Sequence, residues 1–484
     1  MVNFRIISKI IGSLLFIEGF FMSCCAIMAF YFQEDDLMAL LMSLLITFAC
    51  GFLFLYTGRN ADNSLSRRDA YVVVTATWVI FSIFGMFPFL IHGSIPRLVD
   101  AFFETMSGFT TTGATILDDI ESLPHGLLFW RSLMQWIGGL GIVFFTIAIL
   151  PSLVGGSVKV FAAEATGPIK AKMHPRLTTT AKWIWSIYLI LTIGCGLSFW
   201  AAGMDWFEAT NYSMTTTATG GFSIHNNGMT IYQSPTIDYI TILFEFLAGI
   251  NFTLLYISIF KIRPGELFKN SEFKLYIVMV LLATACIMGV LIAMMDYPIE
   301  KAFRNAMFQV VSSITTTGIF NDDIGAWPHI TWIVMGIVMF LGACAGSTSG
   351  GYKCIRGVMT LKVLRNNFRQ IIHPNAVLPV KINGQSVSES RITALFAFFT
   401  LFVLMLLVTT GIMVIAGIDP TNAVTIAMSC VSNVGPSLNE IGPSLFWSDM
   451  ADYIKWTLCL LMLMGRLEIM TVLVLFTHTF WKEN

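Results

Sequence analysis

Four polar segments with the same Ser/Thr-x-x-Gly ending are the residues of this 484-residue chain best suited to cation chemistry. The endings fall at 110–113 (TTTG), 217–220 (TATG), 315–318 (TTTG) and 432–435 (SNVG). Glycine permits the backbone dihedrals that turn successive carbonyls to one side, and such carbonyls replace the water shell of a potassium ion in potassium filters. The endings therefore predict a potassium site. Its expected lining is Thr111, Thr112, Gly113, Ala218, Thr219, Gly220, Thr316, Thr317, Gly318, Asn433, Val434 and Gly435.

The residues before these endings predict how the segments are held. The whole segments occupy 100–115, 205–223, 301–320 and 419–437, and each opens with an amphipathic stretch of about eleven residues. Asp100, Asp205 and Asp419 are suited to cap three of these short helices. An eleven-residue helix is about 16 Å long, half of a bilayer core. It can enter from outside, stop midway with its negative end inward, and return as an extended loop.

Composition places the elements around these segments in a membrane. The chain is 56% hydrophobic and 12% charged, whereas soluble domains carry about 25% charged residues. Its net charge of −1 gives no electrostatic reason to expect a nucleic-acid partner. Apolar runs of about twenty residues or more cross a bilayer core. Ten such spans are expected, at 6–32, 37–57, 70–92, 127–150, 183–203, 237–260, 274–295, 328–352, 392–416 and 453–480.

The distribution of basic residues orients the spans. With the N-terminus in the cytoplasm, 22 of the 28 Lys and Arg residues fall on the cytoplasmic side, five lie outside and one, Arg466, lies in the membrane. Cytoplasmic loops carry an excess of Lys and Arg, so both termini are expected to be cytoplasmic. The segments 58–69, 151–182, 261–273 and 353–391 are then cytoplasmic as well.

The segments and the spans combine into a fourfold internal repeat. After the first two spans, each remaining pair of spans encloses one polar segment. Copies separated by an even number of spans enter the membrane from the same side, so four parallel units can surround one pore. The expected fold is an all-α integral membrane protein of about ten transmembrane helices. Its expected parts are an N-terminal hairpin (1–69) and four helix–pore-loop–helix units (70–158, 159–268, 269–385 and 386–484).

At this level of detail the chain resembles the Trk/Ktr/HKT superfamily of potassium transporters, most closely its bacterial TrkH branch. The resemblance runs essentially from end to end and includes the hairpin at 1–69. It is carried by DAFFETMSGFTTTGAT, WRSLMQWIGGLGI (130–142), ILPSLVGG (149–156), LGACAGSTSGGYKCIR (341–356), HPNAV (373–377) and GRLEIMTVLVLFTHTFW (465–481).

The resemblance implies potassium uptake across a bacterial inner membrane through four re-entrant loops, and a homodimer with one pore in each subunit. It also implies a cytosolic, nucleotide-binding regulatory subunit of the TrkA type. The sequence contains neither G-x-G-x-x-G nor a Walker A motif, so the nucleotide is expected to bind that partner and not this chain. The fourth ending, SNVG, departs most from the family pattern and keeps its glycine, so we expect it to keep the backbone role.

Two further features are candidate gate elements. Glycines and hydroxyl residues interrupt the eighth span at 342–351, which a straight helix tolerates poorly. The resemblance favours an intramembrane loop below the filter, with Gly346, Ser347, Thr348, Ser349 and Gly350 as its core; close helix packing is the alternative. Arg466 matches the arginine of the family's Gly-Arg-Leu-Glu motif and is expected to face the pore. A structural pair with Glu468 or Glu245 is its alternative.

The remaining polar residues and the competing functions receive simpler interpretations. Glu104 and Glu208 are expected to be structural hydrogen-bond acceptors, and Glu18 and Gln135 to be helix–helix contacts. A membrane enzyme is disfavoured, because the sequence contains neither a nucleophile–base pair nor a metal cluster. A carrier that couples potassium to protons or sodium is the alternative to a channel-like conductor. Parallel repeats with re-entrant loops favour the conductor.

Overall fold

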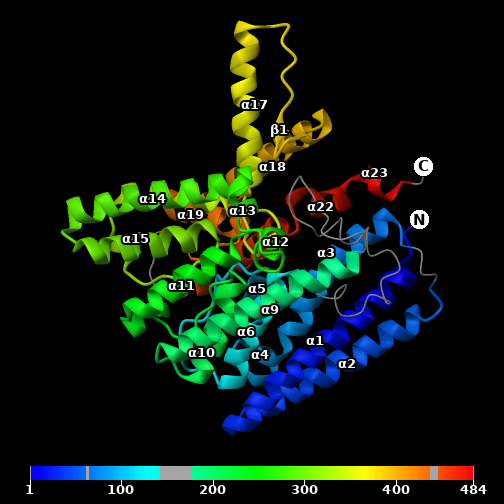
Figure 1. The fold of residues 1–484 in the computed structure, drawn as a ribbon. Coiled ribbons are helices and arrows are strands. Elements are labelled where there is room, and N and C mark those ends of the chain that lie inside the picture. The colour runs from blue at the N-terminus through cyan, green and yellow to red at the C-terminus, as the bar shows by residue number, and fades with distance from the viewer. Residues whose placement is uncertain (1, 62–64, 142–176, 437–444, 483–484) are drawn as a thin grey trace.

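The computed structural model describes residues 2–61, 65–141, 177–436 and 445–482, and these form a helical body with one small β-hairpin (Figure 1). The described residues do not include 142–150 at the end of the expected span 127–150, most of the expected cytoplasmic segment 151–182, or the expected unit boundary at 158/159. The all-α fold class predicted from the sequence is confirmed.

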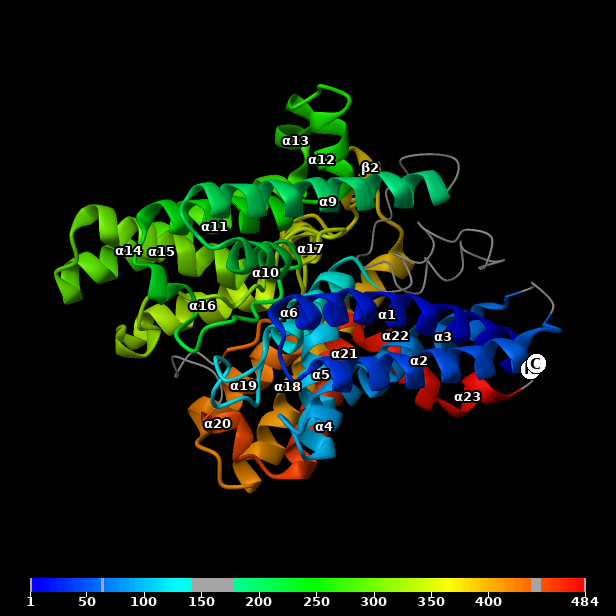
Figure 2. The same cartoon turned by 90° about the horizontal axis from the view of Figure 1, so that it is seen from below.

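The N-terminal hairpin consists of α1 (Phe4–Phe32) and α2 (Leu37–Gly58), which lie side by side along one side of the body (Figures 1 and 2). The two helices approach closely because glycines face the partner backbone. A Cβ atom on Gly12 would lie 2.7 Å from the Leu55 nitrogen, and one on Gly58 would lie 2.6 Å from the Lys9 nitrogen. Small residues of this kind are what apolar helices use to pack without a hydrophobic driving force.

The rest of the chain repeats the order long helix, short helix, outgoing helix. The long helices are α3 (Arg67–Gly85), α9 (Leu177–Ala201), α14 (Ser271–Met295) and α18 (Glu389–Ile415). The short helices are α5 (Leu98–Phe109), α10 (Trp206–Thr217), α15 (Ile299–Ile314) and α19 (Pro420–Ser432). The outgoing helices are α6 (His125–Gly139), α11 (Pro235–Ala248), α16 (His329–Leu341) and α21 (Asp452–Arg466).

Shorter elements connect these helices. They are α4 (Phe87–His92), η1 (Gly228–Tyr232), α12 (Phe252–Ile259), α13 (Gly265–Lys269), η2 (Ile324–Ala326), α17 (Cys354–Ile372), α20 (Leu445–Ser448), α22 (Ile469–Leu473), η3 (Val474–Phe476) and α23 (His478–Trp481). The strands β1 (Lys381–Ile382) and β2 (Gln385–Ser386) pair antiparallel across Asn383 and Gly384. Both turn residues have positive φ, as a two-residue hairpin turn requires.

Contacts between the helices follow a circle. The outgoing helix of each unit packs against the short helix of the next: α6 contacts α10, α11 contacts α15, and α16 contacts α19. The contact of α21 with α5 closes the circle. The ends of the four short helices are therefore brought toward one centre by their neighbours, and the segments that follow them must meet there.

The helices account for part of the expected span count. Among the described residues, six helices are long and apolar enough to cross a membrane, and two bent pairs raise the number to eight at most. The other two expected spans correspond to α6, with 15 residues, and α16, with 13. Length and composition thus support up to eight of the roughly ten spans expected from the sequence.

Two expected spans are wrong as straight helices. The span 237–260 is α11 and α12, bent by 103°, and 453–480 is α21 and α22 with η3, bent by 115°. At the first bend the Asn251 side chain caps α12 by accepting a hydrogen bond from the Thr253 nitrogen at 2.8 Å. At the second, α21 ends at Arg466, and Glu468 two residues later has a positive φ of 62°. Arg466 lies at this bend and not in mid-helix.

Candidate functional site

The segment after each short helix has the same backbone conformation. Thr111, Thr219, Thr316 and Asn433 are left-handed, with φ of 53°, 52°, 59° and 57°. The next nitrogen in each segment bonds back to the carbonyl five residues earlier. These bonds are Thr112 to Ser107 (2.9 Å), Gly220 to Thr215 (2.9 Å), Thr317 to Ser312 (2.8 Å) and Val434 to Ser429 (2.9 Å). Four separate segments that share a costly conformation indicate one shared structural task.

This conformation shifts the alignment of the second segment by one residue. The glycine that follows the bonded nitrogen has positive φ in every segment: Gly113 (84°), Gly221 (80°), Gly318 (77°) and Gly435 (103°). Gly221, and not the expected Gly220, is therefore the counterpart of Gly113. Gly220 corresponds to Thr112, and Ala218 to Thr110. The double glycine at 220–221 made both alignments possible in the sequence.

The four segments touch one another in a closed ring. A Cβ atom on Gly113 would collide with the carbonyl oxygen of Gly220, and one on Gly221 with that of Thr317. In the same way, a Cβ on Gly318 would collide with the Val434 carbonyl, and one on Gly435 would lie 2.5 Å from the Thr112 carbonyl. The four segments are thus brought together, and their expected lining residues are buried apart from a half-buried Gly113. Ala218, as the counterpart of Thr110, lies one residue before the lining of the other segments. At the glycine end, Gly113, Gly221, Gly318 and Pro436 border a cavity of about 40 Å³.

Side chains behind the ring hold the segments in place. Arg131 on α6 pairs with Glu104 at 2.9 Å and donates to the Ser223 carbonyl at 2.8 Å, which ties the first segment to the second. The Glu104 carboxylate also accepts from the Ile116 nitrogen at 3.0 Å, so it serves as the structural acceptor expected from the sequence. Asn433 donates to the Thr112 hydroxyl at 2.9 Å and joins the fourth segment to the first.

Two of the three expected aspartate caps are present. Asp205 accepts from the Phe207 nitrogen at 2.9 Å, and Asp419 from the Thr421 nitrogen at 2.9 Å. The expectation for Asp100 is wrong, because α5 begins at Leu98 and the carboxylate instead forms a 2.5 Å ion pair with Lys455 on α21. Beyond the second segment, Glu208 accepts from His225 (3.1 Å) and Tyr232 (2.8 Å). Burial raises the pKa of the Tyr232 phenol.

The interrupted eighth span forms a loop against the helix end of the ring. After α16 ends at Leu341, the chain runs without helix to Cys354. The Gly350 nitrogen donates to the Thr316 hydroxyl at 2.6 Å, and the Thr348 hydroxyl lies 3.2 Å from the Thr217 carbonyl. A Cβ on Gly350 would collide with the Ser432 carbonyl. The loop therefore touches the second, third and fourth segments at once.

Arg466 connects this loop to the first unit. Its guanidinium donates to the Thr348 carbonyl at 2.8 Å and to the Gly138 and Gly139 carbonyls at 2.8 and 2.6 Å. Neither proposed pairing partner receives these bonds. Glu468 forms an ion pair with Arg356 at 2.7 Å, and both carboxyl oxygens of Glu245 lack a hydrogen-bond partner.

Other residues that hold the loop were not singled out from the sequence. The Glu272 carboxylate on α14 accepts from the Ala345 nitrogen at 2.6 Å and the Ile355 nitrogen at 3.1 Å. Asn251 donates to the Ala345 carbonyl at 2.5 Å from the bend between α11 and α12. The sequence signals that could have identified them are an acidic residue at the end of an apolar span (Glu272) and a polar residue inside one (Asn251). Within the described part of the chain, no cluster of three His, Cys, Asp or Glu side chains could hold a metal ion.

Comparisons with known proteins find similar chains among cation transport proteins. The family described as "TrkH: Cation transport protein" matches residues 37–483. The chain is 35% identical to the Trk system potassium uptake protein TrkH of Escherichia coli K12, over 99% of this chain and 100% of that protein. It is 36% identical to TrkH of Halomonas elongata with the same coverage, and 30% identical to TrkG of Escherichia coli K12 over 99% of both chains.

The fold of this chain also matches that of a solved structure over nearly its whole length. The crystal structure of the potassium transporter TrkH from Vibrio parahaemolyticus superposes with a TM-score of 0.89 at 34% sequence identity. The superposition covers 99% of this chain and all of that one.

Proposed function

Because the chain belongs to the TrkH family of cation transport proteins, we propose that it is the pore-forming subunit of a potassium uptake system. The observation that carries the proposal is the closed ring of four segments with one repeated backbone conformation. A ring of carbonyls around an axis offers a potassium ion the oxygens that it loses with its water shell. The four short helices aim their negative C-terminal ends at this ring, which favours a cation there.

In this proposal the ring selects potassium ions, and the loop at 342–351 opens and closes the path below the ring. A potassium ion leaves the ring at its helix end, where Gly350 and Thr348 contact three of the four segments. The loop and the cationic Arg466 both lie in that path, so their displacement opens it. The membrane potential alone can drive the ion inward, since about 2.3 kcal/mol per charge is available for each 100 mV.

Growth and tracer uptake test the proposed function. Expressed in bacteria that lack their own potassium uptake systems, the chain should restore growth at low potassium when its family's regulatory subunit is present. Uptake of radioactive rubidium, a potassium substitute, should rise in the same cells and be displaced by potassium rather than by sodium. Normal membrane insertion without growth rescue or rubidium uptake would contradict the proposal.

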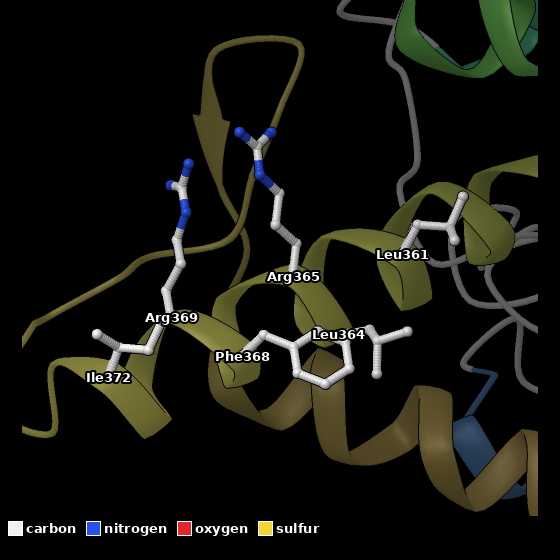
Figure 3. Close-up of a pocket in the computed structure, with 6 residues that line it drawn as sticks. All are labelled: Leu361, Leu364, Arg365, Phe368, Arg369 and Ile372. Atoms are coloured by element: carbon white, nitrogen blue, oxygen red, sulfur yellow. The ribbon is translucent and has the colours of Figure 1, made fainter.

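We also propose how the chain sits and assembles. The proposed location is a bacterial inner membrane with both termini in the cytoplasm, and α1 begins and α23 ends on the same side of the body (Figures 1 and 2). The helix α17 projects from that body and carries an exposed apolar row of Leu361, Leu364, Phe368 and Ile372, with Arg365 and Arg369 beside it (Figures 1 and 3).

Apolar residues spaced by three and four on one helix face are typical of helix pairing. We assign this row to contact with the same row of a second copy of the chain, because a homodimer needs a surface that pairs with itself. The nucleotide-binding regulatory subunit is then left to contact the remaining cytoplasmic surface.

The variant Phe368→Glu tests the dimer. Phe368 is 61% exposed, so the charge is harmless in a monomer but must be desolvated in a helix pair. We expect the mass of the detergent-solubilised protein, measured by light scattering, to fall from two copies to one. The neighbouring exposed residue provides the control, and Asn367→Glu should leave the dimer intact. A dimer that survives Phe368→Glu would assign the row to another partner.

A further inference from the structure

The side chains of Gln135 and Glu245 occupy equivalent positions behind neighbouring segments of the ring, and the tyrosines beside them show this. Tyr188 stacks on Trp136 at 5.5 Å and donates to its carbonyl at 2.9 Å. One unit further on, Tyr276 stacks on Phe246 at 4.9 Å and donates to its carbonyl at 3.2 Å. The residues immediately before Trp136 and Phe246 are Gln135 and Glu245.

A second pair of residues confirms this equivalence. A Cβ on Gly139 would lie 2.6 Å from the Tyr188 hydroxyl and 2.9 Å from Ala218, at the end of the second short helix. A Cβ on Gly249 would lie 2.6 Å from the Tyr276 hydroxyl and 2.8 Å from Thr315, at the end of the third. Gln135 and Glu245 lie four residues before these glycines, so they occupy the same place in consecutive units.

Gln135 clamps the second segment. Its amide nitrogen donates to the Gly220 carbonyl at 2.7 Å, and its amide oxygen accepts from the Phe222 nitrogen at 3.0 Å. Gly220 leaves room for this contact, because a Cβ there would lie 2.5 Å from the amide. Because these bonds are made to the backbone of the ring, Gln135 does more than form the helix–helix contact expected from the sequence.

Glu245 has the same place behind the third segment but different surroundings. Its side chain is completely buried, and Thr317, the counterpart of Gly220, faces its carboxyl. The other titratable groups that face it are Cys195 on α9 and Tyr276 on α14, and neither is a cation. Both carboxyl oxygens lack a hydrogen-bond partner.

An ionised carboxylate is strongly unfavourable in such a place. A buried charge needs a cationic partner or several donors, and an intramembrane carboxyl without them is stable only with its proton. A protonated carboxyl has one O–H donor and one carbonyl acceptor, which is the pattern of the Gln135 amide. The Thr317 hydroxyl, which lies 2.8 Å from that of Thr315, is available to accept this donor.

We propose that Glu245 holds a proton during transport and, as a neutral carboxylic acid, positions the third segment of the ring as Gln135 positions the second. The residue acts through Thr317 and does not touch the ion. The inference rests on the proposed potassium filter, because the effect it predicts is a change in ion selectivity.

Three variants in liposomes test it: Glu245→Gln, Glu245→Leu and Glu18→Leu. The purified full-length protein is reconstituted, and the potassium-to-sodium permeability ratio is measured at pH 6 to 8. Glu245→Gln keeps a neutral donor and acceptor, so its ratio should stay close to wild type across this range. Glu245→Leu removes the O–H group that the proposal directs at Thr317, and the loss of that proposed hydrogen bond, at ordinary strength, should lower the ratio about tenfold.

Glu18 is the matched control, because it is equally buried and its oxygens also lack partners, but it lies on α1 in the N-terminal hairpin. Glu18→Leu should leave the ratio unchanged. Infrared difference spectra supply a readout independent of transport: the carboxylic acid band should lose the Glu245 contribution in Glu245→Gln and keep that of the equally buried Glu18.

The outcomes separate this inference from the proposed function. A wild-type protein without potassium flux would refute the function itself. A selective wild type with a selective Glu245→Leu, or with a Glu245→Gln that loses selectivity, would overturn the inference and leave the function standing. An unchanged carboxylic acid band in Glu245→Gln would overturn it as well, even if Glu245→Leu fails to fold.

Discussion

Replacing Gly113 by Ser should abolish the preference for potassium over sodium. Gly113 has a φ of 84°, and its missing side chain lets the Gly220 carbonyl of the next segment approach. A Cβ would collide with that oxygen, which belongs to the backbone and moves only if the second segment moves. We expect the ring to open or shift, so that sodium permeates almost as well as potassium. Reversal potentials in mixed potassium and sodium solutions measure this directly.

Gly93 offers a control with the same backbone strain. Its φ is also 84°, but nothing lies within 4 Å of the position of its Cβ. Serine in the left-handed region costs about 1–2 kcal/mol at either site. Gly93→Ser should therefore lower stability by this amount and leave selectivity intact. If a well-folded Gly113→Ser protein is as selective as Gly93→Ser, the proposal that the four segments form one potassium filter is refuted.

Replacing Arg466 by Gln should increase potassium flux about a hundredfold without changing selectivity. At about 5 Å and an effective dielectric constant of about 20, the guanidinium repels a passing potassium ion by roughly 3 kcal/mol. Each 1.4 kcal/mol corresponds to about tenfold in rate. The variant also removes the hydrogen bond to the Thr348 carbonyl that holds the gate loop. Flux per folded molecule, measured in liposomes, checks the prediction.

The variant Arg466→Lys separates charge from hydrogen bonding. Lysine keeps the positive charge but lacks the planar fork that reaches the Thr348, Gly138 and Gly139 carbonyls together. If repulsion limits the flux, Arg466→Lys stays slow while Arg466→Gln is fast. A purely structural role predicts lower yield for both variants. Normal yield with unchanged or reduced flux in Arg466→Gln would contradict the barrier.

The sequence predicted the repeated elements well because each carries a local signal. The four endings, the short helices before them and the caps at Asp205 and Asp419 are legible from residue type and spacing. The family resemblance rests on motifs such as DAFFETMSGFTTTGAT and LGACAGSTSGGYKCIR, which can be read directly from the sequence. That the ring is a filter and the loop a gate remains a proposal, supported by geometry and by relatives.

Features that depend on contacts between units were not predictable in this way. The register of the second segment depends on which of two adjacent glycines meets the Thr317 carbonyl, and that is a contact with another unit. The bends after Ala248 and Arg466 interrupt runs that are apolar enough to read as continuous helices. The sequence offers Glu245 as a partner for Arg466, because it does not show that Thr317 and Tyr276 surround the Glu245 carboxyl.

The reversal potential of the purified chain in liposomes, under imposed potassium, sodium and proton gradients, tests the central claim most directly. A selective conductor predicts a potential that follows the potassium gradient alone. It should stay the same when sodium is exchanged for an impermeant cation or when a proton gradient is added at fixed potassium. A potential that shifts with the proton gradient would contradict the account and indicate a coupled carrier instead. A potential that shifts with the sodium gradient would contradict it as well, because the conductor would then be coupled to sodium or not selective for potassium.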